Sequence, residues 1–179
     1  MTSSTEDTTA MTSSTDCREA IGRFLAKDFA TWTGLPAACD LATVARILPL
    51  AEGEGRLVLG QDSHDTFYRM ARVPAYTEPV RVCYRDDTVV RISTQFPALV
   101  EPRALLDTLG QPAATLDYYF SSMPVLNKQG EWVYADRGLT LLLSSDKDNV
   151  VEVMVYPPTT MERYKKELYY LETPREFEP

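Results

Sequence analysis

The chain has 179 residues, of which 44% are hydrophobic, 10% aromatic and 25% charged, a composition typical of a globular protein with one good core. Its formal net charge is -8 at pH 7, and no cluster of Lys and Arg interrupts the acidic balance, so we expect no nucleic-acid partner. No apolar run approaches the roughly 20 residues of a membrane-spanning helix, and the N-terminus lacks a signal-peptide pattern. These features predict a cytoplasmic protein with no membrane partner.

Three cysteines, Cys17, Cys39 and Cys83, lie far apart and form no Cys-x-x-Cys pair. This spacing suggests neither a zinc site nor a disulfide framework, so we expect reduced thiols, no metal and no cofactor. The odd number leaves at least one free thiol, and a bridge between Cys39 and Cys83 stays open as an alternative.

The first predicted elements follow a polar N-terminal segment. Residues 1–15 are too polar to form a core and predict a disordered tail, in which the pentad MTSST at Met1 and Met11 favours two alternative start sites. Helical spacing then runs from Asp16 through Ile21, Phe24, Leu25, Phe29 and Trp32, with Gly34 as the expected stop. Asp40 caps a second short helix that Pro49 ends. Residues 51–65, AEGEGRLVLGQDSHD, are predicted to form a loop with a brief strand at Leu57 to Leu59.

Strands and two further helices make up the rest of the chain. Alternating apolar residues on both sides of Asp86-Asp87 predict an antiparallel hairpin over 80–96. A helix begins at Glu101 or Pro102 and ends at Gly110. Further strands are expected at 114–120, 131–135, 139–143 and 150–156. Thr159 and Glu162 form the capping box of a last helix, with ion pairs four residues apart from Glu162 to Lys166 and from Arg163 to Glu167, before a frayed tail at 173–179.

This order of elements predicts an α+β fold in which an antiparallel meander sheet has helices packed on one face, plus a C-terminal helix. We expect one domain over 16–172, and a repeated helix-and-strands pattern suggests two αβ units at 40–97 and 101–157. The second unit, LLDTLGQP followed by EWVYADRGLTLLLSSDKDNVVEVMVYPP, resembles the helix, Gly-x-Pro and meander pattern of BamE-like lipoprotein domains and of β-lactamase inhibitory protein-like units. The resemblance implies helices on one face of an antiparallel sheet and a role in binding. The chain lacks a lipobox cysteine and the paired cysteines of the inhibitor. We therefore assign no compartment, target or functional residue to it from this resemblance.

Two short stretches contain residues that could act as acids and bases. The only histidine, His64, lies between Asp62 and Asp65 in GQDSHD, where an aspartate could orient the imidazole. Asp136 and Arg137 follow a predicted strand and could line a ligand mouth. The simpler interpretation of both stretches is a solvated turn. As an alternative function, a small cyclase-like or isomerase-like enzyme with an apolar pocket would use His64, Asp62 and Asp136 as its catalytic residues.

The aromatic residues of the predicted sheet point to binding instead. Tyr118, Tyr119, Trp132 and Tyr134, together with Arg137, are the candidate binding residues, because Tyr and Trp give large amphipathic contact area at low entropic cost. We therefore predict a non-catalytic binding or accessory protein that presents an aromatic-rich sheet face to a protein partner or a small organic ligand. The edge strands of such a sheet also offer a route to a homodimer.

Overall fold

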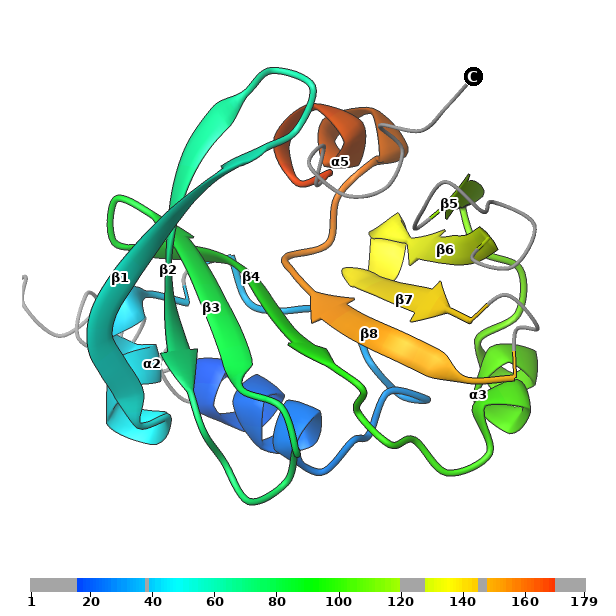
Figure 1. Ribbon diagram of the computed structural model, residues 1–179, viewed down its shortest axis with the longest axis horizontal. Helices are drawn as coiled ribbons and strands as arrows, with labels where there is room; N and C mark the ends of the chain where they lie inside the picture. Colours follow the sequence, from blue (N-terminus) through cyan, green and yellow to red (C-terminus); the bar gives the residue numbers. More distant parts are fainter. Residues whose placement is uncertain (1–15, 38, 120–127, 145–147, 170–179) are drawn as a thin grey trace, which may run out of the picture.

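The strands of the protein form one open antiparallel sheet. The structure, a computed structural model, describes residues 16–37, 39–119, 128–144 and 148–169, with the backbone alone at 116–119 and 128–129. Eight strands lie in the order β1-β2-β3-β4-β8-β7-β6-β5 (Figure 1). The predicted α+β class with an antiparallel meander sheet is confirmed, whereas the predicted tails at 1–15 and 173–179 lie outside the described residues. Within the described ranges, no helix is long and apolar enough to cross a membrane.

A helix over residues 16–25 comes first. The later elements are α2 (Leu41–Ile47), β1 (Leu50–Leu59), β2 (His64–Ala71), β3 (Val80–Arg85), β4 (Thr88–Gln95), α3 (Pro102–Leu109), β5 (Ala114–Tyr119), β6 (Lys128–Tyr134), η1 (Ala135–Arg137), β7 (Leu139–Leu143), β8 (Val150–Val155) and α5 (Met161–Glu167). A helix followed by a four-stranded meander thus occurs twice, as α2 with β1 to β4 and as α3 with β5 to β8. The two meanders join through their last strands, β4 and β8, so both halves share one sheet.

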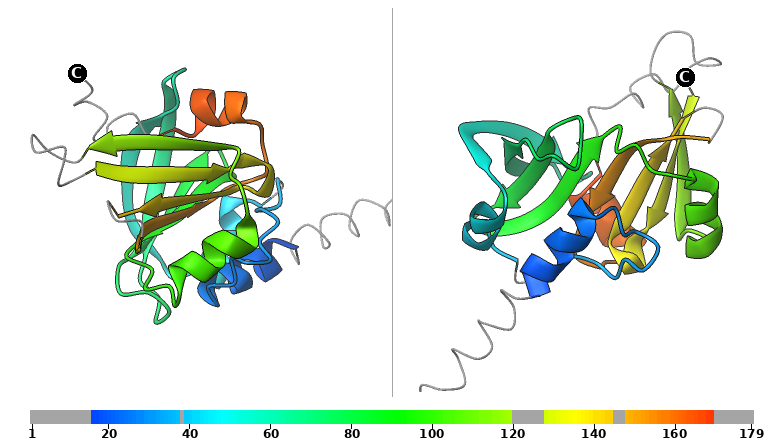
Figure 2. Two further views of the ribbon diagram at one scale, coloured as in Figure 1. Left: turned by 90° about the vertical axis from the view of Figure 1, so that its right-hand side faces the viewer. Right: turned by 90° about the horizontal axis from the view of Figure 1, so that it is seen from below.

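The N-terminal helix, α2 and α3 cover one face of the sheet, which we call the helical face (Figure 2). Inward residues of the strands, such as Val82, Ile92 and Val153, are fully buried against Phe24 and Val44 of these helices. The alternation predicted from the sequence produces this face, because successive residues of a strand point to opposite sides.

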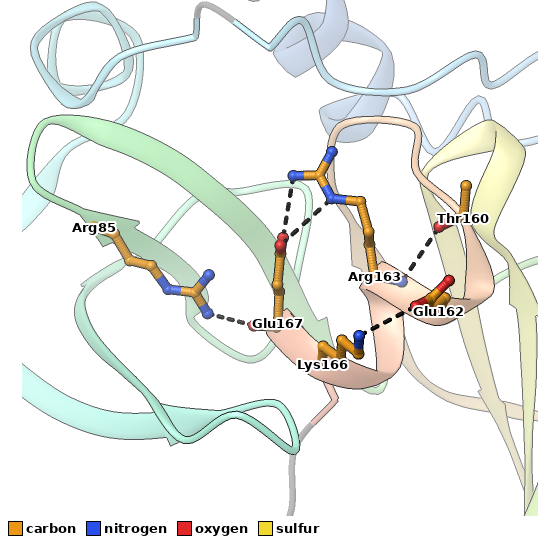
Figure 3. A network of polar contacts seen from close by, with 6 residues as sticks. All are labelled: Arg85, Thr160, Glu162, Arg163, Lys166 and Glu167. Atoms are coloured by element: carbon orange, nitrogen blue, oxygen red, sulfur yellow. Dashed lines mark hydrogen bonds and ion pairs between the residues drawn. The ribbon is translucent and has the colours of Figure 1, made fainter.

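The last helix, α5, packs on the opposite face of the sheet, which we call the α5 face. Thr160 caps it by accepting a hydrogen bond from the Arg163 N–H at 3.3 Å, so the predicted cap at Thr159 is wrong by one residue. The two predicted ion pairs are confirmed, with Lys166 Nζ 3.1 Å from Glu162 and Arg163 Nε 3.4 Å from Glu167 (Figure 3). Figure 3 also shows Arg85 of β3 donating a hydrogen bond to the Glu167 carbonyl, which ties α5 to the sheet.

The N-terminal helix is shorter than predicted. It ends at residue 25, and Lys27 then adopts a left-handed conformation with φ 58°. Phe29 and Trp32 therefore lie in the following turn and loop, yet each is only 1% exposed. The apolar spacing that predicted a longer helix therefore arises because Phe29 and Trp32 are buried in the core, although they lie outside the helix.

The predicted loop over 51–65 is instead occupied by most of β1 and the start of β2. The first half of β1 is exposed and contains Glu52, Gly53 and Glu54, which lower the β propensity of this edge strand. Gly55 pairs with Tyr68 across the ladder, and a side chain at Gly55 would overlap the Tyr68 ring. The glycine that suggested a loop instead lies in the strand and leaves room for the Tyr68 ring.

The expectation of reduced thiols is wrong. Cys17 of the N-terminal helix and Cys39 of the loop before α2 form a disulfide, with their Cα atoms 5.3 Å apart. The alternative bridge from Cys39 to Cys83 is also wrong, since Cys83 is a buried free thiol whose pKa is raised by that burial. Disulfides are rare in reducing cytosol, and the predicted cytoplasmic location stays a prediction.

Candidate binding surface

A groove lies beside the segment that joins the two halves of the sheet. This linker, residues 96–101, runs from the end of β4 to α3, and we call the hollow next to it the linker groove. Its volume is about 450 Å³. It is lined by Ala26, Lys27, Asp28, Phe29, Ala30, Leu99, Val100, Glu101, Ala104, Leu105 and Thr108. The walls therefore come from the turn after the N-terminal helix, from the linker and from α3, which lie on the same side of the sheet (Figure 2).

The linker exposes large apolar side chains. Val100 is 88% exposed and Phe96 is 59% exposed, and among the described residues only Phe67, at 37%, is a third exposed large hydrophobic. Scattered apolar residues are normal on a protein surface. Here two of them lie four residues apart on one segment, and Val100 also lines a groove with Leu99 and Leu105.

The backbone around the groove is strained. Phe96, Ala98 and Glu101 of the linker have φ angles of 47°, 53° and 54°, and Lys27 on the opposite wall has 58°. A left-handed conformation is unfavourable for residues with a Cβ atom, and such strain gathers at functional sites. The surrounding contacts hold the linker in a shape that its sequence alone does not favour.

The polar groups at the rim are mostly engaged with the protein. The Lys27 ammonium lies 5.2 Å from the centre of the Tyr76 ring, and the Asp28 carboxylate accepts a hydrogen bond from Thr31 Oγ1 at 3.0 Å. Tyr76 is buried, which raises the pKa of its hydroxyl, and that hydroxyl donates to the Phe24 carbonyl. Exposed Glu101 and Thr108 share the accessible part of the groove with Val100 and the half-buried Leu99 and Leu105.

The proposed catalytic residues do not assemble into an acid-base site. His64 begins β2 and is half-buried, while Asp62 is exposed in the preceding turn, where its N–H donates to the Lys166 carbonyl at 3.1 Å. The carboxylate of Asp65 pairs with Arg56 at 2.7 Å. Asp136 is exposed in η1, and no hydrogen bond within the described part of the chain joins His64 to any of these aspartates.

Of the predicted aromatic binding face, the structure describes the side chains of Trp132, Tyr134 and Arg137. Tyr134 is 2% exposed and donates a hydrogen bond to the Gly110 carbonyl at 3.1 Å, so it is a core residue. Trp132 is half-buried and packs on the core of the helical face. Arg137 is half-buried at the end of η1. The backbones of Tyr118 and Tyr119 lie in the edge strand β5, but their side chains are outside the described residues.

Sequence reasoning missed the linker, although the sequence contains a signal. The stretch FPALVEP, residues 96–102, places three apolar residues between prolines at a point where neither strand nor helix periodicity explains them. Apolar residues that serve no element are candidates for contact with another molecule. Only the structure shows that this linker borders a groove.

No group of three or more His, Cys, Asp or Glu side chains within the described ranges is arranged to hold a metal ion. Comparisons of the chain with models of protein families, with curated proteins and with solved structures found no match. A function therefore has to be inferred from the chain's own residues.

Proposed function

We propose that the protein is a non-catalytic binding protein that holds an apolar segment of another protein in the linker groove. The observation that carries this proposal is the 88% exposure of Val100 on a strained linker beside an apolar groove. Burial of apolar surface contributes roughly 25 cal/mol per Å², so a partner that covers Val100 and Phe96 gains affinity from contacts that this chain leaves unused.

The shape of the site supports the same proposal. Ligand sites are concave and mostly apolar, and protein partners commonly insert a few large anchors into such grooves. The residues around the opening of the groove include Asp28 and Glu101, while Lys27 is directed to the Tyr76 ring. A segment with apolar anchors therefore fits better than an acidic one.

The resemblance to BamE-like and β-lactamase inhibitory protein-like units points in the same direction. The resemblance implies helices on one face of an antiparallel sheet, and those families act by binding. The linker groove differs from the aromatic sheet face predicted from the sequence, since Tyr134 and Trp132 pack toward the core.

The proposal can be tested with a library of 12-residue peptides displayed on phage and selected on the full chain. Selected peptides are synthesised with a fluorescent label, and their dissociation constants are measured by anisotropy for the wild type and for Val100→Asp. Because Val100 is exposed, this change leaves the fold intact, which circular dichroism checks. The matched control is Phe67→Asp, which places the same charge on the exposed hydrophobic of β2.

We expect selected peptides that share apolar anchors and bind Val100→Asp at least about tenfold more weakly, since a buried carboxylate without a partner costs more than 1.4 kcal/mol. Binding to Phe67→Asp should be unchanged. Equal affinity for Val100→Asp and the wild type, or an equal loss in both variants, would contradict the linker groove as the binding site.

A further inference from the structure

A smaller hollow on the α5 face contains charged groups that none of the preceding contacts uses. Its volume is about 110 Å³, and it is lined by Met70, Glu78, Pro79, Arg81, Ser93, Thr94, Gln95 and Glu152. Arg81 pairs with Ser93 across β3 and β4, and Gln95 pairs with Glu152 across β4 and β8. Arg81 and Glu152 thus lie on strands that flank β4, and the hollow lies over the residues between them.

Arg81 lies near the Glu152 carboxylate and acts on it electrostatically, but it is held in place by an aromatic ring. Its guanidinium carbon lies 4.6 Å from the centre of the Tyr68 ring, a cation-π contact that helps to position the group. Within the described part of the chain, no carboxylate forms an ion pair with it and no hydrogen bond uses its five N–H donors. A guanidinium fork of this kind binds a carboxylate through two parallel hydrogen bonds.

Glu152 supplies the opposite charge at the other end of the hollow. It is half-buried, and this burial raises its pKa although Arg91 and Arg81 act in the opposite direction. A carboxylate that burial destabilises gains from a cationic ligand, because the ligand neutralises the charge that the protein has desolvated. Glu78 adds a second carboxylate to the lining, so the hollow as a whole prefers a ligand that carries an ammonium group.

We propose that this hollow binds a small zwitterion of the α-amino acid class, with the ligand carboxylate on Arg81 and the ligand ammonium on Glu152. A simple anion would face Glu78 and Glu152, and a simple cation would face Arg81, so only a molecule with both charges satisfies both ends. The hollow is small, with a volume of about 110 Å³, so we expect a short amino acid to fit best. Met70 provides the apolar contact for a short side chain.

The inference does not rest on the linker groove, since the two sites use different residues. It can be tested by nuclear magnetic resonance titration of the ¹⁵N-labelled full chain with glycine, alanine and serine. Acetate has only the carboxylate of an amino acid and methylammonium only its ammonium group, and both are titrated in parallel on the wild type. Arg81→Gln and Glu152→Gln remove one end of the site each, and Arg56→Gln is the matched control, because Arg56 pairs with Asp65 at the sheet edge.

We expect saturable shifts of the Ser93 and Gln95 amides with at least one amino acid at millimolar concentration. Each charge-assisted hydrogen bond contributes enough that either variant should bind about tenfold more weakly, whereas Arg56→Gln should bind like the wild type. The absence of any saturable shift in the wild type would overturn the proposal, since no amino acid would then bind in the hollow. Equal binding of acetate or methylammonium would overturn it as well, because then only one end of the site acts.

Discussion

The two faces of the sheet are built from the same strands but in opposite ways. On the helical face, the strands β3, β4, β6, β7 and β8 contribute apolar residues to one core, which three helices cover. On the α5 face, smaller apolar clusters are interspersed with buried polar residues, among them Arg91, Glu131 and Thr140. Thr140 Oγ1 hydrogen-bonds the Tyr164 hydroxyl at 3.2 Å, and that hydroxyl donates to Glu131.

The two faces therefore contribute differently: the apolar core mainly to the stability of the fold, and the buried polar groups mainly to its unique geometry. Apolar burial is not directional and supplies most of the folding free energy. Buried polar groups contribute little net stability, but they are costly to leave without partners and so fix one geometry. We therefore expect substitutions on the helical face to cost more than those on the α5 face, and the α5 face to respond to pH.

The largest effect is expected for Phe24→Ala on the helical face. Phe24 is fully buried, and its ring contacts Phe29 and Tyr76 with centroids 5.9 and 5.2 Å away. The cavity should lower the free energy of unfolding by about 3–5 kcal/mol in a urea titration. A loss below about 1 kcal/mol, in the range of ordinary surface changes, would show that this face is not the main source of stability.

The disulfide that anchors the N-terminal helix to the same face should matter next. Cys17 and Cys39 are 22 residues apart, so the Cys17→Ser change should cost about 3 kcal/mol through the loop entropy of the unfolded chain. Alkylation of the unfolded protein provides the direct check. Without reductant only Cys83 should react, and modification of all the cysteines under that condition would contradict the bond.

On the α5 face, Tyr164→Phe should cost less. The change keeps the ring and removes the hydroxyl that donates to Glu131, so we expect a loss of about 1–3 kcal/mol. Met161→Ala on the same helix is the control for lost apolar contact. If Tyr164→Phe destabilised the protein as much as Phe24→Ala, the contrast between the two faces would fail.

The smallest effect is expected for Glu152→Gln, and its sign depends on pH. The folded-state pKa of Glu152 lies above its ordinary value of 4.5, so the folded chain binds this proton more tightly than the unfolded chain does. Stability should therefore fall as pH rises from 4.5 through the folded pKa, and Glu152→Gln should remove that part of the fall. Unfolding curves of both proteins across this range measure the difference. If the pH dependence were the same in both proteins, the effect of burial on the Glu152 pKa would not exceed the opposite effect of Arg91 and Arg81.

Most of the fold could be predicted because local signals agreed with packing. The cap at Asp40, the turn at Asp86-Asp87 and the stop at Gly110 are all present, because each depends on a few neighbouring residues. The strand β1 could not be predicted, since its glycines suggest a loop and the Tyr68 ring that packs on Gly55 comes from another strand. The partner of Cys17 was equally hidden, because spacing in sequence does not reveal which cysteines the fold brings together.

The candidate site was harder to predict than the fold. Aromatic residues of a strand predict neither which face they occupy nor what covers that face, and Tyr134 proved to be a core residue. The exposure of Phe96 and Val100 depends on the path of the linker, which their own sequence does not favour. Strain of this kind is set by the surrounding structure and is not visible in the sequence.

The most direct test of the account is to map the binding surface by nuclear magnetic resonance with a peptide selected on the full chain. We predict that amide shifts gather at residues 26–30 and 96–108, around the linker groove, and that Val100→Asp abolishes them. Shifts confined to the strands of the α5 face, or shifts that persist in Val100→Asp, would contradict the claim that the protein binds its partner at the linker.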